Sequence, residues 1–147
     1  SEKENITAQQ VVDILNKKSG YLGISGVTSD QRDLRAASAE GNTRAQLAID
    51  IQKYQIRKYI GAFAAAMGGL DAVVFTGGIG ENDTEVRQQA CENLDYMGIT
   101  FNAEANKTRG KETKISTDSS RVQVWVIPTN EELLIARDTK EIVTGSK

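Results

Sequence analysis

The longest regular pattern in the chain runs from about Thr43 to Met67. Its apolar positions are Leu47, Ile49, Ile51, Tyr54, Ile56, Ile60, Phe63 and Met67. Because these positions leave little of the surface purely polar, the pattern predicts a helix that is buried on more than one side, either in a larger core or in a subunit interface. Residues 61–69 are mostly small, which lets another backbone approach closely.

The segment before this helix predicts two shorter helices. Thr7 and Gln10 have the spacing of a capping box, and the apolar residues after them suit one face of a helix that ends near residues 19–20. Closely spaced glycines over residues 21–34 indicate an irregular, exposed connection. A second short helix is expected over about residues 30–40.

Two apolar runs, residues 71–76 and 122–127, predict strands that are buried on both faces. A helix is expected after each, over about residues 83–95 and 130–142. The order strand, helix, strand, helix is typical of right-handed parallel crossovers, so the expected fold class is α/β.

Two strands make a thin sheet for so much helix. Either further strands are hidden from single-sequence analysis, with residues 98–101 a marginal candidate, or the chain is part of a larger protein.

Composition excludes several classes of function. The chain has 147 residues, a net charge of -2 and no concentrated basic face, so neither nucleic acid nor an anionic membrane is an expected partner. The lysine-rich residues 106–114 carry no aromatic side chain and are expected to form a solvated loop. No apolar run is long enough to span a membrane.

Histidine is absent, which removes the usual general base, and the single cysteine, Cys91, is expected to serve packing. One cysteine also excludes an internal disulfide and fits a reducing compartment. Together with a polar N-terminal stretch that lacks the features of a signal peptide, this predicts a cytoplasmic protein.

The first strand is followed by a glycine-rich segment, residues 77–82, with sequence GGIGEN. It lacks the Lys-Ser/Thr of a Walker A loop and the third glycine of a dinucleotide fingerprint. Glu81 and Asp83 would repel a phosphate at this position, whereas bare glycine backbone admits a flat ring or a sugar. The segment therefore favours a nucleoside over a triphosphate tail. The alternative is a tight strand–helix turn with an acidic first turn.

The second strand is followed by Pro128, Thr129 and then Asn-Glu-Glu. Thr129 and Glu132 have capping-box spacing, which leaves the carboxylate of Glu131 without a structural role. A spare carboxylate at the carboxyl end of a strand is a candidate ligand for Mg²⁺. The alternative is an exposed acid in the first turn of a helix.

A third candidate lies in the connection before the second short helix. Asp30 can accept hydrogen bonds from ribose or adenine, and Arg32 can stack on a base or pair with a phosphate. The alternative is a helix start with a local salt bridge.

Four segments occur in this order: GISGVTSDQRDLR, DAVVFTGGIGEN, EVRQQACENLDYMGI and VIPTNEELLIARDT. Together they resemble the C-terminal part of acetate kinases in the acetate/propionate/butyrate kinase family. The resemblance covers roughly residues 24–139. It implies an α/β fold: a partial ribonuclease-H-like (actin-like ATPase) domain of parallel strands with flanking helices. Residues 1–147 would be the C-terminal part of the second acetate kinase domain, with the N-terminal domain absent.

The resemblance also implies roles for particular residues. The segment of Asp30, Gln31 and Arg32 would line the nucleotide site. The loop of Gly78, Ile79 and Asn82, which includes Gly80, would contact the adenosine part of ATP or ADP, and Glu131 would help to hold Mg²⁺. Members of the family are homodimers joined largely through this half.

The family's Asn-x-Gly-Ser-Ser-Ser motif, catalytic aspartate and transition-state arginines and histidines have no counterpart here. The expected parent is an acetate kinase that transfers the γ-phosphoryl of ATP to acetate, giving acetyl phosphate and ADP. The chain by itself is expected to hold no catalytic residue and to be inactive. Alternatives are a propionate or butyrate kinase, a non-enzymatic nucleotide-binding or dimerisation module, and an unrelated acyltransferase, for which no Ser-His or Cys-His pair is available.

Overall fold

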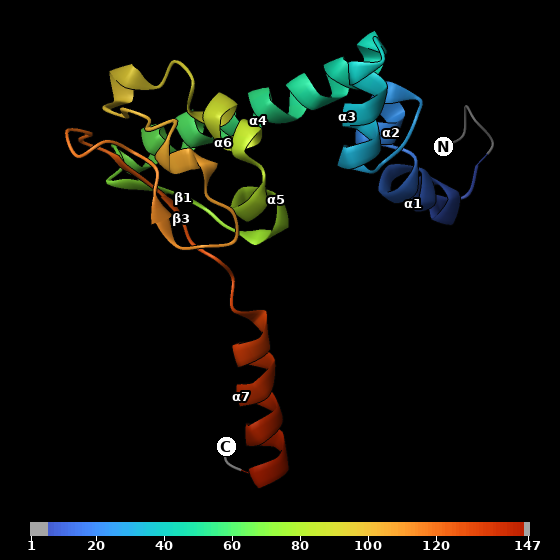
Figure 1. Cartoon of the computed structure of the whole chain (residues 1–147). Coiled ribbons are helices and arrows are strands. Elements are labelled where there is room, and N and C mark those ends of the chain that lie inside the picture. Colours follow the sequence, from blue (N-terminus) through green and yellow to red (C-terminus); the bar gives the residue numbers. More distant parts are fainter. Residues whose placement is uncertain (1–5, 146–147) are drawn as a thin grey trace. The chain divides into compact units, whose positions relative to one another are not determined.

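The computed structural model describes residues 6–145 (Figure 1). The chain divides into two compact units, Ser1–Lys58 and Tyr59–Lys147, which are described separately.

The first unit is helical. Its elements are α1 (Ala8–Lys17), α2 (Gly20–Ser25), α3 (Gln31–Ala39) and the first part of α4 (Thr43–Met67). The predicted capping box at the start of α1 is confirmed, since the Thr7 backbone N–H donates to Gln10 Oε1 over 2.7 Å and the Gln10 N–H donates back to Thr7 Oγ1 over 3.2 Å. The core of this unit is formed by Leu34, Ala45, Ala48 and Ile49.

The irregular connection predicted over residues 21–34 is wrong in its first part, because α2 occupies Gly20–Ser25. Gly26, with φ of 70°, ends this helix in the left-handed conformation that glycine adopts without strain. The glycines of this segment thus lie within α2 and at its C-terminal end. Their close spacing did not indicate an irregular connection.

The long helix α4 has the predicted bounds, Thr43–Met67. The described residues do not bury α4 on a second side, since Tyr54, Phe63 and Met67 are 63%, 60% and 67% exposed.

The second unit contains a small mixed sheet and short helices. Its elements are the last part of α4, β1 (Ala72–Phe75), α5 (Gly77–Asn82), α6 (Thr84–Cys91), the 3₁₀ turns η1 (Asp95–Met97) and η2 (Ala105–Lys107), β2 (Thr113–Lys114), β3 (Gln123–Val126) and α7 (Glu131–Thr144). The predicted helix over residues 83–95 ends early, at Cys91, and Asn93 takes a positive φ of 58° in the turn that follows. Cys91 is buried, as its packing role requires.

The strand order is β1-β3-β2. β1 and β3 are parallel and lie side by side in Figure 1, with Val73 opposite Val124 and Phe75 opposite Val126, which confirms the predicted parallel pair. β2 is antiparallel to β3 and lies in the segment predicted to be a solvated loop. The marginal strand predicted over residues 98–101 is a single bridge between Phe101 and Ser116.

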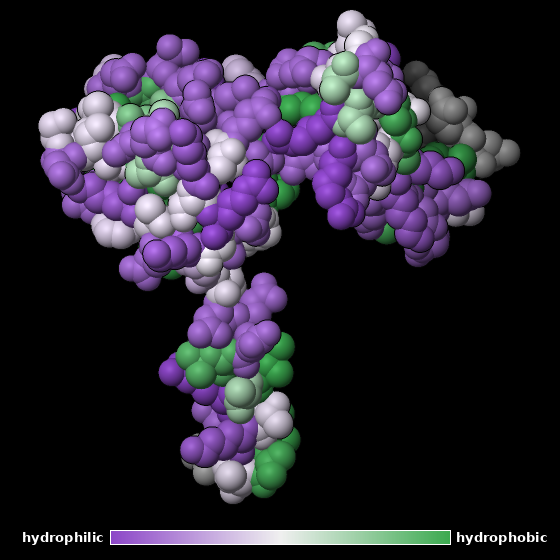
Figure 2. Space-filling model, viewed as in Figure 1, coloured by the Kyte–Doolittle hydropathy of each residue, from purple (hydrophilic) through white to green (hydrophobic). Residues whose placement is uncertain are grey.

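Among residues 6–145, only one face of the sheet is covered, so the prediction of strands buried on both faces is wrong for this part of the chain. Phe75, Val124 and Val126 are buried, whereas Val74, which points to the opposite face, is 49% exposed. No residue of α7 is buried along its full length, and its apolar side chains are visible as a green surface in Figure 2.

Candidate functional site

The carboxyl ends of the two parallel strands bring the two predicted polar segments of the second unit together. Phe75 pairs with Val126 at the end of the parallel ladder. The hydrogen bonding continues one residue further, where the Ile127 N–H donates to the Phe75 carbonyl over 3.0 Å. The hydroxyls of Thr76 and Thr129 then lie 2.8 Å apart. Ligands of open α/β sheets gather at this edge, so the register of β1 and β3 places a candidate site here.

Glu81 links the two segments directly. Its carboxylate accepts a hydrogen bond from the backbone N–H of Thr129, with 2.8 Å between Oε1 and N. This bond lowers the pKa of Glu81 below its ordinary value. Glu81 therefore connects the segments that follow β1 and β3 through a hydrogen bond. Its position in the sequence did not reveal this role.

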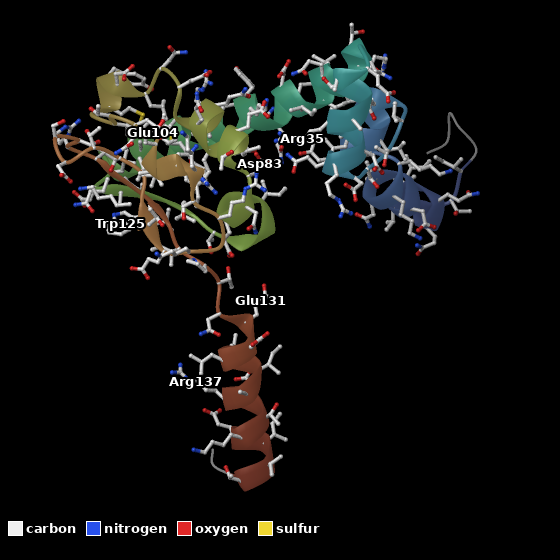
Figure 3. The ribbon with its side chains drawn as sticks, viewed as in Figure 1. Arg35, Asp83, Glu104, Trp125, Glu131 and Arg137 are labelled. Carbon is white, nitrogen blue, oxygen red and sulfur yellow. The ribbon has the colours of Figure 1, made fainter. Side chains whose placement is uncertain are left out.

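An open pocket of about 370 Å³ lies between these segments. It is lined by Gly77, Gly78, Glu81, Thr129, Asn130, Glu131 and Glu132. Figure 3 shows Glu131 at the first turn of α7. The pocket unites part of the predicted adenosine loop with the predicted metal ligand.

The predicted capping box of Thr129 and Glu132 is wrong. The N-cap of α7 is Asn130, whose Oδ1 accepts from the Leu133 N–H over 3.0 Å. Asparagine is among the strongest N-cap residues, and a cap one position later places Glu131 and Glu132 in the first two positions of the helix. Glu132 therefore has no capping role, and both carboxylates border the pocket.

The glycine-rich segment is the helix α5, where a turn was one of the two predictions. Within it the Asn82 side chain donates to the Gly78 carbonyl over 3.0 Å, and Ile79 is 40% exposed. A Cβ added at Gly80 would lie 3.1 Å from the Phe75 carbonyl carbon, whereas a Cβ at Gly78 would meet no atom within 4 Å. Packing against β1 therefore requires the glycine at position 80 but not the one at position 78.

The buried side chain of Arg87 supports α5 from α6. Its Nη1 donates to the carbonyls of Gly80 and Glu81, over 2.9 and 2.8 Å. Its other donors bind the segment around Asn106. No signal in the sequence distinguished this arginine from a surface residue.

The third predicted group, Asp30, Gln31 and Arg32, lies in the first unit. Asp30 is the N-cap of α3, and its carboxylate also binds the Arg32 guanidinium over 2.7 Å, which is the helix start with a local salt bridge foreseen as an alternative. The bonds from Arg32 lower the pKa of Asp30 to about 2. Gln31 donates to Gln52 over 3.2 Å, while the Arg32 side chain remains 90% exposed.

The side chains around Glu131 determine whether the predicted Mg²⁺ site is chemically reasonable. Within residues 6–145, no cluster of three or more Asp, Glu, Cys or His side chains is placed to hold a metal ion. Mg²⁺ in nucleotide sites takes one or two protein carboxylates, phosphate oxygens and waters, so an exposed carboxylate beside a polar pocket fits this ion. Glu131 is such a carboxylate. In the same described range, no helix is long and apolar enough to cross a membrane.

Comparison with protein families finds a match to the acetokinase family over residues 1–137. An acetate kinase of Caldanaerobacter subterraneus subsp. tengcongensis is 58% identical over 99% of the chain, and the match spans 37% of that enzyme. An acetate kinase of Halothermothrix orenii is 54% identical over 97% of the chain and 36% of its own length. The chain thus spans little more than a third of the relatives that it matches.

Solved structures similar to this chain are also acetate and propionate kinases. The acetate kinase of Porphyromonas gingivalis superposes with a TM-score of 0.88 at 49% identity, covering 97% of this chain and 36% of that one. A propionate kinase of Francisella tularensis superposes with a TM-score of 0.79 at 36% identity, covering 92% of this chain and 34% of that one. The α/β fold described above is therefore the fold of the matching part of these kinases.

Proposed function

The chain belongs to the acetokinase family, and on this premise we propose that it is the nucleotide-binding, C-terminal portion of an acetate kinase. The parent protein would transfer the γ-phosphoryl of ATP to acetate and give acetyl phosphate and ADP, in a reversible reaction. The family match over residues 1–137 and relatives named acetate kinase support this proposal. Residues 1–147 would be the C-terminal part of the second domain.

The pocket at the ends of β1 and β3 is the observation that carries the proposal, because it joins the glycine segment to Glu131. Gly78 and Ile79 are exposed at α5, and an adenosine would lie against the backbone of Gly78, which carries no Cβ. We assign Gly78, Ile79, Gly80 and Asn82 to adenosine, and Asp30, Gln31 and Arg32 to the nucleotide.

We assign Glu131 to the Mg²⁺ that accompanies ATP or ADP. Mg²⁺ supplies neutralisation of charge on the phosphates, which is the main requirement of phosphoryl transfer besides alignment of the reacting groups. This chain would contribute alignment of the nucleotide. Backbone and side-chain amide groups of α5 would orient the nucleoside, and the Glu131 carboxylate at the start of α7 would hold the Mg²⁺ bound to the phosphates.

The proposal extends to assembly and compartment. A homodimer would cover the exposed apolar side of α4, where the rings of Tyr59 and Phe63 stack with centroids 6.0 Å apart. A cytoplasmic location agrees with a sequence whose single cysteine, Cys91, excludes an internal disulfide.

A first experiment assays the chain of 147 residues alone with ATP, Mg²⁺ and acetate in a coupled assay for acetyl phosphate. No turnover above the no-enzyme control is expected. Turnover well above it would contradict the proposal that the catalytic groups lie elsewhere in the parent protein.

A second experiment uses a chimera in which this chain replaces the matching segment of the Caldanaerobacter acetate kinase, which is 58% identical. The chimera should phosphorylate acetate, and Glu131→Ala should lower kcat and raise the Mg²⁺ concentration needed for half-maximal activity. Glu112→Ala is the matched control, because Glu112 is an exposed glutamate outside the pocket. Unchanged metal dependence in Glu131→Ala would remove Glu131 from the proposed Mg²⁺ site, and an inactive unmodified chimera would favour a nucleotide-binding or dimerisation module without metal chemistry.

The similarity to a propionate kinase at 36% identity supports a second candidate substrate. The candidate acyl substrates are therefore acetate, propionate and butyrate. Comparing kcat/KM for the three acids in the complete parent protein tests the preference.

A further inference from the structure

We infer that Glu81 is a positioning residue that holds the Glu131 segment in place through the backbone of Thr129. The carboxylate of Glu81 accepts the Thr129 N–H over 2.8 Å, and Thr129 precedes Glu131 by two residues. The assignment of Glu131 to a metal rests on the proposed function, whereas the tie between Glu81 and Thr129 does not.

Thr129 is fixed on two sides. Its N–H is bound by Glu81, and its hydroxyl lies 2.8 Å from that of Thr76, the residue that immediately precedes α5. The next residue, Asn130, is fixed in turn by the bond of its Oδ1 with the Leu133 N–H. Thr129 and Asn130, the two residues before Glu131, are thus each held by at least one hydrogen bond.

Glu81 is itself anchored to the interior. Its carbonyl accepts from Arg87 Nη1 over 2.8 Å and from the Gly110 N–H over 3.2 Å. Arg87 is fully buried, so its guanidinium has little freedom to move. The carboxylate of Glu81 therefore extends from a rigid base toward Thr129, as a positioning residue requires.

The inferred role depends on a hydrogen-bond acceptor and not on negative charge. Glutamine at position 81 keeps an acceptor oxygen at the same distance from the backbone, whereas alanine removes it. A residue that acted on the metal by its charge would lose its effect in both variants, so the pair Glu81→Gln and Glu81→Ala separates the two roles.

The first test uses the 147-residue chain and needs no activity. Amide hydrogen exchange measured by NMR should show Thr129 exchanging about three- to tenfold faster in Glu81→Ala than in the unmodified chain, because one hydrogen bond is lost. Glu81→Gln should exchange near the original rate, and Glu112→Ala should leave Thr129 unchanged. Equal exchange at Thr129 in the unmodified chain and in Glu81→Ala would overturn the inference.

The second test measures Mg²⁺ dependence in the chimera. Glu81→Ala should raise the half-saturating Mg²⁺ concentration about three- to tenfold, and Glu81→Gln should restore most of the loss. Equal impairment by both variants would overturn positioning through the hydrogen bond. An unmodified chimera without acetate phosphorylation would instead contradict the proposed function, and the exchange rates at Thr129 would still decide the role of Glu81.

Discussion

Arg87 and Asn106 are joined by two hydrogen bonds inside the second unit. Arg87 Nε donates to Asn106 Oδ1 and Nη2 donates to the Asn106 carbonyl, each over 2.8 Å. The remaining donors bind the carbonyls of Gly80, Glu81 and Thr108, so all five N–H groups of the guanidinium are used. Burial lowers the pKa of Arg87, and as an arginine it still carries its charge.

Arg87→Lys should therefore destabilise the second unit although it keeps the charge. A lysine has three donors and no planar fork, so buried carbonyls lose their partners. We expect a loss of about 2–4 kcal/mol in the free energy of unfolding, measured by urea denaturation.

Arg109→Lys is the control for this change, because Arg109 lies in the same segment as Thr108 but is exposed. Its effect should stay within about 0.5 kcal/mol. Equal midpoints for the two variants would mean that the Arg87 network does not stabilise the fold.

Two of the three glycines of α5, Gly78 and Gly80, should respond in opposite ways to substitution by alanine. Gly80→Ala places a methyl group 3.1 Å from the Phe75 carbonyl carbon and should destabilise the unit by about 1–3 kcal/mol. Gly78→Ala meets no atom within 4 Å and lies in a helix, so it should stabilise by about 0.5–1 kcal/mol. Thermal unfolding of both variants measures the contrast.

The same Gly78→Ala variant tests the adenosine assignment. In the chimera its methyl group would occupy space proposed for the nucleoside, so the KM for ATP should rise while stability is kept. A KM for ATP equal to that of the unmodified chimera would remove Gly78 from the proposed nucleotide site.

Asn130→Ala should loosen the first turn of α7. The side chain satisfies the Leu133 N–H, and loss of an N-cap of this kind costs about 1 kcal/mol. The Leu133 amide should exchange faster in this variant, whereas Asn130→Asp, which keeps the acceptor, should remain near the original rate. Unchanged exchange in Asn130→Ala would place the start of the helix elsewhere.

Asp30 should titrate far below an ordinary aspartate. Hydrogen bonds from Arg32 lower its pKa from 3.8 to about 2, so its contribution to stability is present above the unfolded value and is lost as the pH falls through about 2. Carboxyl ¹³C shifts measured by NMR give the midpoint. Arg32→Gln should move it upward toward 3.8, and a midpoint that does not respond to this change would contradict the observed pair.

Local patterns were sufficient for the longest helix and for the two parallel strands, but not for the short elements α2 and β2. The apolar spacing predicted α4 with its observed bounds, and the two apolar runs predicted the parallel pair of β1 and β3. These features depend on residues close in sequence, through helical periodicity and β-branched composition. β2 was not predicted, because its two residues, Thr113 and Lys114, are too few to show an alternating pattern.

The sequence by itself determined which segments carry the candidate chemistry, since the four motifs that resemble acetate kinases contain every predicted site residue. Only the tertiary structure decided what individual residues do there. Glu81 binds Thr129 across 48 positions of the chain, and this contact exists because the register of β1 and β3 brings their carboxyl ends to one edge. Gly80 differs from Gly78 for the same reason: what a side chain would meet depends on the neighbouring element, which no local pattern specifies.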